Sequence, residues 1–249
     1  GGKGLGIKLF TDFINRDLRE NNGKQTVVLS LKDANADRSA FTYNLERGSA
    51  AEIKPEPWMW ATDLSGNWFY RKGAVNRMSI PVMIGNAVDV ISKNGVVMLN
   101  VALRGDGTLP EKQAAYLTAF REFLEINGEG IYGTRPWKTF GEGPLKMKDG
   151  RQGENKKPFS QRDIRFTTRD GKLYAFVLAP PTRDIVIKTL RTGGPLDSEI
   201  TSIDLLGSQE QIHWNRSSEA LTIKLPRTLP DLPVIGFQIA AEDIRTPGR

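Results

Sequence analysis

The pattern of hydrophobic and polar positions divides the chain into two parts with different periodicities. In the first part, helical and strand patterns alternate. Apolar residues recur at helical spacing over 7–21, and a short continuous apolar run at 26–31 is typical of a strand covered on both faces. Residues 58–64 are the next predicted strand, and 79–92 are the next predicted helix, with Pro81 in its first turn.

Two further elements end this first part. Residues 96–103 form the clearest buried strand and 110–127 the clearest helix, because Pro110 suits a first helical turn and Gly128 suits a helix end. Helices that alternate with strands indicate parallel βα units. About three or four such units are too few for a closed eight-stranded barrel, which typically takes about 250 residues.

The second part has the short, regularly spaced strands of an all-β fold. It follows residues 141–162, where Gly, Lys, Asp and Pro dominate and apolar residues are few. The sequence Arg-Asp-Gly at 169–171 is a hairpin signal between two apolar runs. Strands are predicted at 164–168, 172–178, 184–190, 200–205, 221–225 and 234–240.

These patterns predict the fold class α/β followed by all-β. Residues 1–140 are expected to form the later βα units of a partial (β/α)8-like barrel, and 163–249 an antiparallel β-sandwich. Residues 141–162 are the predicted linker between them. A chain of 249 residues is long enough to bury a substantial core in such an arrangement.

Composition narrows the chemistry that this fold can carry. The chain has no cysteine, which excludes disulfides and thiolate metal sites. Its one histidine, His213, cannot form a multi-histidine metal site, and its place in a predicted strand suits a structural or exposed side chain. We therefore expect no metal and no other cofactor.

Charge and hydropathy exclude two classes of partner. The net charge of +6 comes from scattered basic residues with no nucleic-acid-binding motif, and no stretch approaches the roughly 18 apolar residues of a membrane span. We expect a soluble protein with neither a nucleic-acid nor a membrane partner. Its location stays open, and a secreted or periplasmic protein whose signal peptide is absent from this chain is one alternative.

A series of segments in a specific order carries the candidate chemistry. It begins with Glu46 in 44–48 (NLERG) and continues with 55–60 (PEPWMW), 96–107 (VVMLNVALRGDG) and 127–137 (NGEGIYGTRPW). With the predicted sandwich behind it, this order resembles the later part of the α-L-fucosidases of glycoside hydrolase family 29. The resemblance implies a barrel-like catalytic domain, a C-terminal β-sandwich and hydrolysis of terminal α-L-fucosyl linkages with retention of configuration.

The resemblance makes Glu46 the candidate acid/base. A retaining glycosidase uses one carboxylate as nucleophile and a second carboxyl group that protonates the leaving oxygen and then activates water. Glu46 lies on a polar loop between two predicted strands, where barrel enzymes place their chemistry. The alternative is a structural role, in which Glu46 pairs with Arg47 or Arg38 and holds the loop.

Four further residues are candidates for substrate binding. Trp68 matches a family position that contacts fucose, and Trp58 and Trp60 are further aromatic candidates, since a ring face suits the apolar face of a deoxy sugar. Each tryptophan has the alternative of packing in the core. Lys32 follows the strand at 26–31 and would reach a sugar hydroxyl or the nucleophile, with a solvated lysine as the alternative.

The chain also departs from the family pattern. Met59 stands where relatives often carry a polar residue, and the family nucleophile strand is expected just before Gly1. Asp12 and Asp17 lie within the first predicted helix, which argues against either as nucleophile. We therefore expect an α-L-fucosidase truncated before its nucleophile, with a non-catalytic fucose- or glycan-binding module or an inactive fragment as alternatives. The expected partners are a fucosylated glycan and either further copies of the chain or a missing N-terminal segment.

Overall fold

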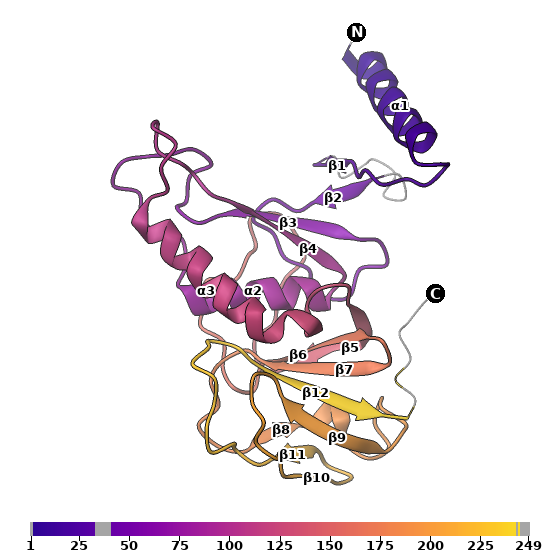
Figure 1. Cartoon of the computed structure of the whole chain (residues 1–249), viewed down its shortest axis with the longest axis vertical. Helices are drawn as coiled ribbons and strands as arrows, with labels where there is room; N and C mark the ends of the chain where they lie inside the picture. The colour runs from indigo at the N-terminus through magenta and orange to yellow at the C-terminus, as the bar shows by residue number, and fades with distance from the viewer. Residues whose placement is uncertain (1, 33–40, 243, 245–249) are drawn as a thin grey trace.

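The computed structural model describes residues 2–32, 41–242 and 244. A parallel sheet, a pair of helices and two antiparallel sheets follow one another along the long axis of the molecule (Figure 1). The first helix, α1 (Gly2–Glu20), stands to one side of this stack. Among the described residues, no helix is both long and apolar enough to span a bilayer.

The parallel sheet has four strands in the order β1-β2-β3-β4, and every neighbouring pair is parallel. Its strands are β1 (Ser30–Leu31), β2 (Thr42–Asn44), β3 (Trp58–Asp63) and β4 (Gly95–Asn100). Strands β3 and β4 are joined through a helix, which confirms the predicted βα arrangement. Because all four strands run the same way, their carboxyl ends meet at one edge of the sheet.

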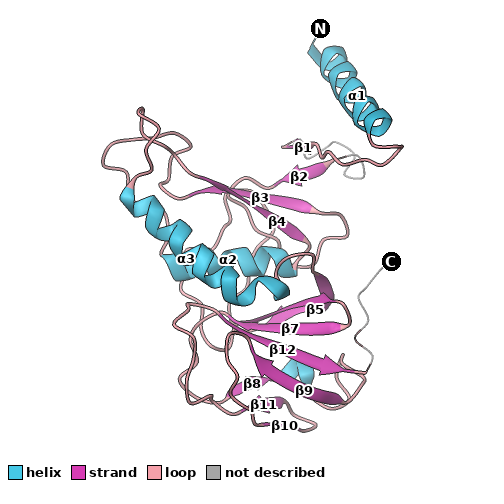
Figure 2. Ribbon diagram, in the orientation of Figure 1, coloured by secondary structure: helices cyan, strands magenta, loops and turns pink. Residues whose placement is uncertain are grey.

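The two central helices lie where the sequence predicts them. Helix α2 (Ile80–Ser92) begins after Ser79 with Pro81 in its first turn, and α3 (Glu111–Asn127) begins after Pro110 and runs into the 3-10 turn η1 (Gly128–Gly130). Both helices lie between the parallel sheet and the antiparallel sheets (Figure 2). Helix α2 is buried along most of its length because it is covered from both sides.

Two predicted strands of the first part are less buried than expected. The run at 26–31 forms strand structure only at Ser30–Leu31, and Val28 is 69% exposed. Strand β1 lies at the end of the sheet, so no neighbour covers its outer side within the described residues. Strand β4 lies at the opposite end, and Val96 and Met98 are exposed there. The continuous apolar runs thus predicted the strands, but they did not predict that part of each strand is exposed to solvent.

The second part contains a five-stranded sheet, β5-β6-β7-β12-β9, and a three-stranded sheet, β10-β11-β8, both antiparallel. The strands of the larger sheet are β5 (Arg135–Glu142), β6 (Ile164–Arg169), β7 (Lys172–Val177), β12 (Ile235–Ala241) and β9 (Ile200–Leu205). Those of the smaller sheet are β10 (Trp214–Arg216), β11 (Leu221–Ile223) and β8 (Ile185–Ile187), and β8 is followed by the 3-10 turn η2 (Lys188–Leu190).

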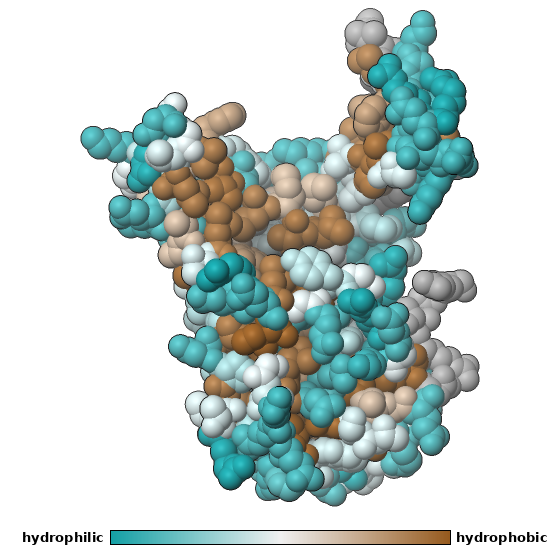
Figure 3. Space-filling view, in the orientation of Figure 1, coloured by the Kyte–Doolittle hydropathy of each residue, from teal (hydrophilic) through white to brown (hydrophobic). Residues whose placement is uncertain are grey.

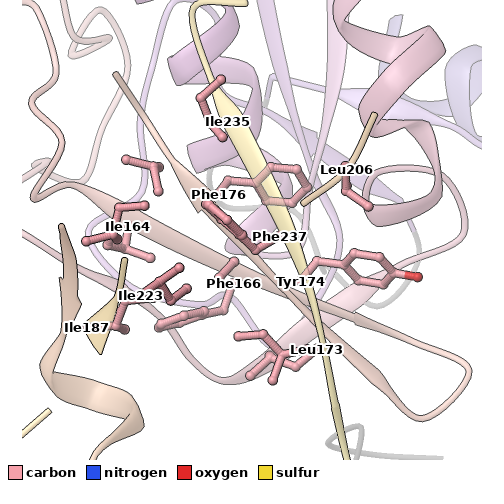
Figure 4. Close-up of a cluster of buried hydrophobic side chains, with 14 of the residues drawn as sticks. Ile164, Phe166, Leu173, Tyr174, Phe176, Ile187, Leu206, Ile223, Ile235 and Phe237 are labelled. Atoms are coloured by element: carbon pink, nitrogen blue, oxygen red, sulfur yellow. The ribbon is translucent and has the colours of Figure 1, made fainter. Parts of the chain in front are cut away.

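The main core lies between these two sheets. Phe166 and Phe237 of the larger sheet and Ile187 and Ile223 of the smaller one are fully buried in one cluster (Figure 4). Strands β6 and β7 are buried along nearly their whole length, which would not occur in a sheet with one solvent-exposed face. The reason is that α2 and α3 cover the other face of the larger sheet, where Phe176 packs at 6.5 Å, centroid to centroid, from Phe123 of α3.

The boundary between the two parts differs from the prediction. The expected limit at residue 140 falls inside β5, which pairs with β6 and so belongs to the antiparallel part. The expected linker at 141–162 is also folded against the first part, because Gly150 pairs with Ser49 and Glu154 is buried. A polar, glycine-rich composition predicted an irregular segment correctly, but it does not reveal that the segment is fixed in place.

Candidate active site

Glu46 stands at the carboxyl edge of the parallel sheet. Strand β2 ends at Asn44, and the chain beyond it stays attached to β3: the Leu45 amide donates to the Met59 carbonyl at 2.8 Å and the Arg47 amide donates to the Ala61 carbonyl at 2.8 Å. The backbone on both sides of Glu46 is therefore fixed by the neighbouring strand. Barrel enzymes carry their catalytic groups at this edge of the sheet.

Three donors hold the Glu46 carboxylate. The Lys32 ammonium lies 2.5 Å from Oε2, the Arg151 guanidinium donates to the same oxygen at 3.2 Å, and the Trp68 indole N–H donates to Oε1 at 3.0 Å. The side chain is 14% exposed. The hydrogen bond and charge of Lys32 lower the pKa of Glu46, with smaller contributions in the same direction from Trp68 and Arg151, against the opposing effect of burial.

Trp68 is itself held from two sides. The Asn100 side-chain amide, at the end of β4, donates to the Trp68 carbonyl at 3.0 Å. The Arg47 guanidinium lies 5.1 Å from the ring centroid, a distance at which a cation is attracted to the aromatic face. Arg47 donates in turn to the fully buried Asp63 carboxylate, with Nε 2.8 Å from Oδ2. These contacts fix the ring that binds Glu46.

The structure thus brings together Lys32, Glu46 and Trp68 from three different segments. The structural alternative for Glu46 is partly answered, because Arg47 pairs with Asp63 and not with Glu46. Arg38, the other partner considered for Glu46, lies outside the described residues.

Trp58 and Trp60 lie elsewhere, and here the prediction needs correction. Both indole rings are buried in the cluster that joins the parallel sheet to α2. The Trp58 N–H donates to the Lys93 carbonyl at 2.9 Å and the Trp60 N–H donates to the Glu154 carboxylate at 3.1 Å. Buried rings with satisfied donors leave no face for a sugar, so Trp58 and Trp60 are not part of the proposed site.

Arg151 is the site residue that sequence reasoning missed. It lies in the segment expected to be a linker, 105 positions after the glutamate that it contacts. An arginine in a polar, irregular stretch gives no signal of its own, and only the folding of 148–154 onto the Glu46 loop brings it to the carboxylate.

Asp17 of α1 has a structural role. The Asp17 carboxylate accepts hydrogen bonds from the Thr26 amide at 2.6 Å, the Thr26 hydroxyl at 2.5 Å and the Asn21 amide at 2.9 Å, so it fixes the turn after the helix. These bonds, led by the Thr26 hydroxyl, lower the pKa of Asp17. Within the part of the chain that the structure describes, no group of three or more acidic, histidine or cysteine side chains is arranged to hold a metal ion.

A parallel βα sheet with a held carboxylate at its carboxyl edge, followed by an antiparallel sandwich, is the arrangement of part of a (β/α) barrel with an appended β domain. A family model described as alpha-L-fucosidase matches residues 9–129, and one described as the alpha-L-fucosidase C-terminal domain matches 156–236. The two matches follow the order of the parallel and antiparallel parts. The chain belongs to the α-L-fucosidase family.

Individual relatives agree with this assignment. The tissue alpha-L-fucosidase of Rattus norvegicus is 28% identical over 195 residues, which is 76% of this chain and 37% of the rat protein. A solved alpha-L-fucosidase superposes with a TM-score of 0.72 at 21% identity, covering 94% of this chain and 49% of its own. The Thermotoga maritima alpha-fucosidase, solved with a mechanism-based inhibitor, gives 0.68 at 21% identity, covering 90% and 47%.

These structural likenesses confirm the predicted fold class, an α/β part related to the fucosidase catalytic domain followed by an all-β part. The chain spans 37% of the length of the rat relative and 49% of the length of the solved fucosidase with the TM-score of 0.72.

Proposed function

We propose that this chain contributes the acid/base part of an α-L-fucosidase active site, which hydrolyses terminal α-L-fucosyl linkages of glycans with retention. Family membership supports the reaction class. The observation that carries the assignment to a residue is the position of Glu46 at the carboxyl edge of the sheet, held by Lys32, Trp68 and Arg151.

In this proposal Glu46 protonates the glycosidic oxygen as the fucosyl bond breaks, and then removes a proton from the water that releases fucose. A retaining reaction also needs a carboxylate nucleophile about 5–5.5 Å from the acid/base. We assign that role to no described residue, because Asp17 is bound in the turn after α1 and Asp63 is paired with Arg47.

Trp68 and Lys32 have supporting roles in the proposal. Trp68 orients the Glu46 carboxylate through its N–H and offers its ring to the apolar face of the sugar. Lys32 is half exposed and binds Glu46 in the free protein, so it is placed to exchange this contact for a sugar hydroxyl. Both roles follow from the contacts that Trp68 and Lys32 make with the Glu46 carboxylate.

A second candidate function is binding of a fucosylated glycan without turnover. The observation that favours it is the pair Phe69 and Tyr70, which are exposed beside Trp68. Exposed aromatic rings next to a polar site are suited to stacking on sugars. Binding of fucose in calorimetry together with absence of hydrolysis would support this candidate over the enzyme.

The experiment is hydrolysis of an aryl α-L-fucoside by the wild-type chain and by Glu46→Gln. Loss of a general acid/base is expected to lower kcat/KM by about 10²–10⁴-fold. The loss should be smaller for a dinitrophenyl fucoside, whose leaving group needs no proton. Glu125→Gln, an exposed glutamate of α3, is the matched control and should keep wild-type activity.

One result would contradict the assignment of Glu46, and a second would show that the chain alone does not carry the reaction. If Glu46→Gln retained full activity on both substrates, Glu46 would not be the acid/base. If the wild-type chain turned over no fucoside under any condition, the chain alone would not carry the reaction, and calorimetry with fucose would decide between glycan binding and an inactive fragment.

A further inference from the structure

The segment 148–154, which we call the strap, lies between the two regions that the family models match, 9–129 and 156–236. It follows β5 and precedes β6, and it returns from the antiparallel part to the loop that carries Glu46. What the strap does there rests on the proposed acid/base role of Glu46, and it adds a residue that neither family match covers.

Backbone hydrogen bonds fasten the strap to residues 46–49. They run from Ser49 N to Gly150 O (3.0 Å), Gly150 N to Ser49 O (3.1 Å), Gln152 N to Glu46 O (3.1 Å) and Glu154 N to Arg47 O (3.0 Å). The approach is close enough that a Cβ on Gly48 would lie 2.5 Å from the Gly150 carbonyl oxygen, so glycine is required there. The strap and the Glu46 loop therefore form one rigid unit.

A buried carboxylate anchors the far end of the strap. Glu154 accepts hydrogen bonds from the Thr62 hydroxyl at 2.7 Å, the Trp60 indole at 3.1 Å and Arg77 Nε at 2.9 Å. A buried carboxylate with this many donors is costly to displace, because its release would leave the Arg77 charge unpaired. The anchor fixes the position from which Arg151 extends.

Arg151 projects from this fixed segment to Glu46. Its guanidinium and the Lys32 ammonium share Oε2 of the carboxylate, while the Trp68 indole takes Oε1. Among the described residues, these are the charged and polar groups that bind the Glu46 carboxylate, and they come from three different segments. The nearby Arg47 is neutralised by Asp63. Arg151 is 46% exposed, so it contacts both the carboxylate and solvent.

We propose that Arg151 is a positioning residue of the active site. It holds the Glu46 carboxylate where it also contacts Lys32, and it tunes the affinity of Glu46 for the catalytic proton. A cation beside a carboxylate favours the charged form. When Glu46 gives up its proton to the leaving oxygen, Arg151 stabilises the carboxylate that remains. The same contact lowers the fraction of Glu46 that is protonated at neutral pH.

The test is a carbon-13 NMR titration of the chain labelled at the glutamate side-chain carboxyl carbon, with the Glu46 signal assigned from its absence in Glu46→Gln. Arg151→Gln is expected to move the titration midpoint of Glu46 to higher pH, and Arg151→Lys is expected to return it toward wild type. Arg121→Gln on α3 removes an equal charge far from the site and is the control, with no expected shift. Retention of the thermal unfolding transition shows that each variant is folded.

An unchanged Glu46 midpoint in folded Arg151→Gln would overturn the proposal, as would an equal shift in Arg121→Gln. This readout does not require turnover, so it is separate from the test of the fucosidase function. Where hydrolysis is measurable, the alkaline limb of kcat/KM reports loss of the proton from the acid in the free enzyme. That limb should move to higher pH in Arg151→Gln and stay in place in Arg121→Gln.

Discussion

At the scale of single residues, the ion pair between Asp63 and Arg47 stabilises the candidate site. Asp63 is fully buried, and Arg47 bridges it to the face of Trp68. Arg47 adopts a left-handed backbone conformation with φ of 48°, which costs energy for a side chain other than glycine. This conformation persists because the ion pair and the neighbouring strand hold it.

We therefore predict that Asp63→Ala destabilises the protein by about 3 kcal/mol, because it leaves a largely buried guanidinium without its partner. Urea unfolding at pH 7 measures the change. Asp197→Ala is the control: its carboxylate pairs with Lys138 but is 82% exposed, and its loss should cost within about 0.5 kcal/mol. Equal effects of the two substitutions would show that the buried pair contributes no more than a surface one.

The residues of the candidate site differ in whether a local sequence pattern predicts them. Glu46 and Trp68 were predicted because each stands in a motif that resembles the family locally. Trp58 and Trp60 share the same motif region, but alternation along β3 and the cover of α2 bury them. Arg151 depends on a contact between segments about a hundred positions apart, which no local pattern encodes.

At the scale of elements, α2 joins the two parts of the molecule through a buried charge cluster. Asp89 accepts from Arg165 Nε of β6 at 2.6 Å and from the Lys93 ammonium at 2.9 Å. All three side chains are nearly inaccessible, and the Phe140 ring of β5 lies 4.4 Å from the ammonium. Burial is the main cause that lowers the pKa of Lys93, against the opposing effect of Asp89.

Asp89→Asn is expected to destabilise the protein by about 3–5 kcal/mol at pH 7, because two buried cations lose their counter-charge. The loss should shrink as pH rises. With Asp89 gone, Lys93 binds its proton less tightly in the folded than in the unfolded chain, so stability increases toward the ordinary lysine pKa of about 10.4. Urea unfolding at pH 7 and pH 9 measures both effects.

The control for this prediction is Asp184→Asn, which removes an exposed partner of Lys224 in the antiparallel part. It should change stability little, and equally at both pH values. A pH-independent loss in Asp89→Asn would contradict the role assigned to Lys93 in the cluster.

Helices and strands were predictable to different degrees. Helices α2 and α3 were placed within a residue or so at each end because prolines, glycines and apolar spacing are local signals. The three-residue strand β2 was missed, since its pairing with β1 and β3 is set by the sheet and not by its own composition. The boundary near Arg135 was missed because β5 joins its sheet through pairing with the later strand β6.

At the scale of the whole molecule, the parallel part has more apolar surface than its helices cover. A groove of about 1150 Å³ runs between β4 and α3, lined among others by Val96, Leu99, Phe120 and Leu124. Apolar atoms are visible over this side of the molecule and along α1, where Leu9 is exposed (Figure 3). Exposed apolar surface of this extent usually marks an interaction site.

We therefore expect the isolated chain to associate with itself through this groove, one of the two partners predicted from the sequence. Val96→Lys places a charge in the groove and should weaken self-association in sedimentation velocity at micromolar concentration. Val186→Lys is a close control, because Val186 is 47% exposed on β8 of the sandwich and Val96 is 46% exposed on β4. A monomeric wild-type chain would contradict self-association. An equal effect of both lysines would mean that added charge, and not the groove, controls solubility.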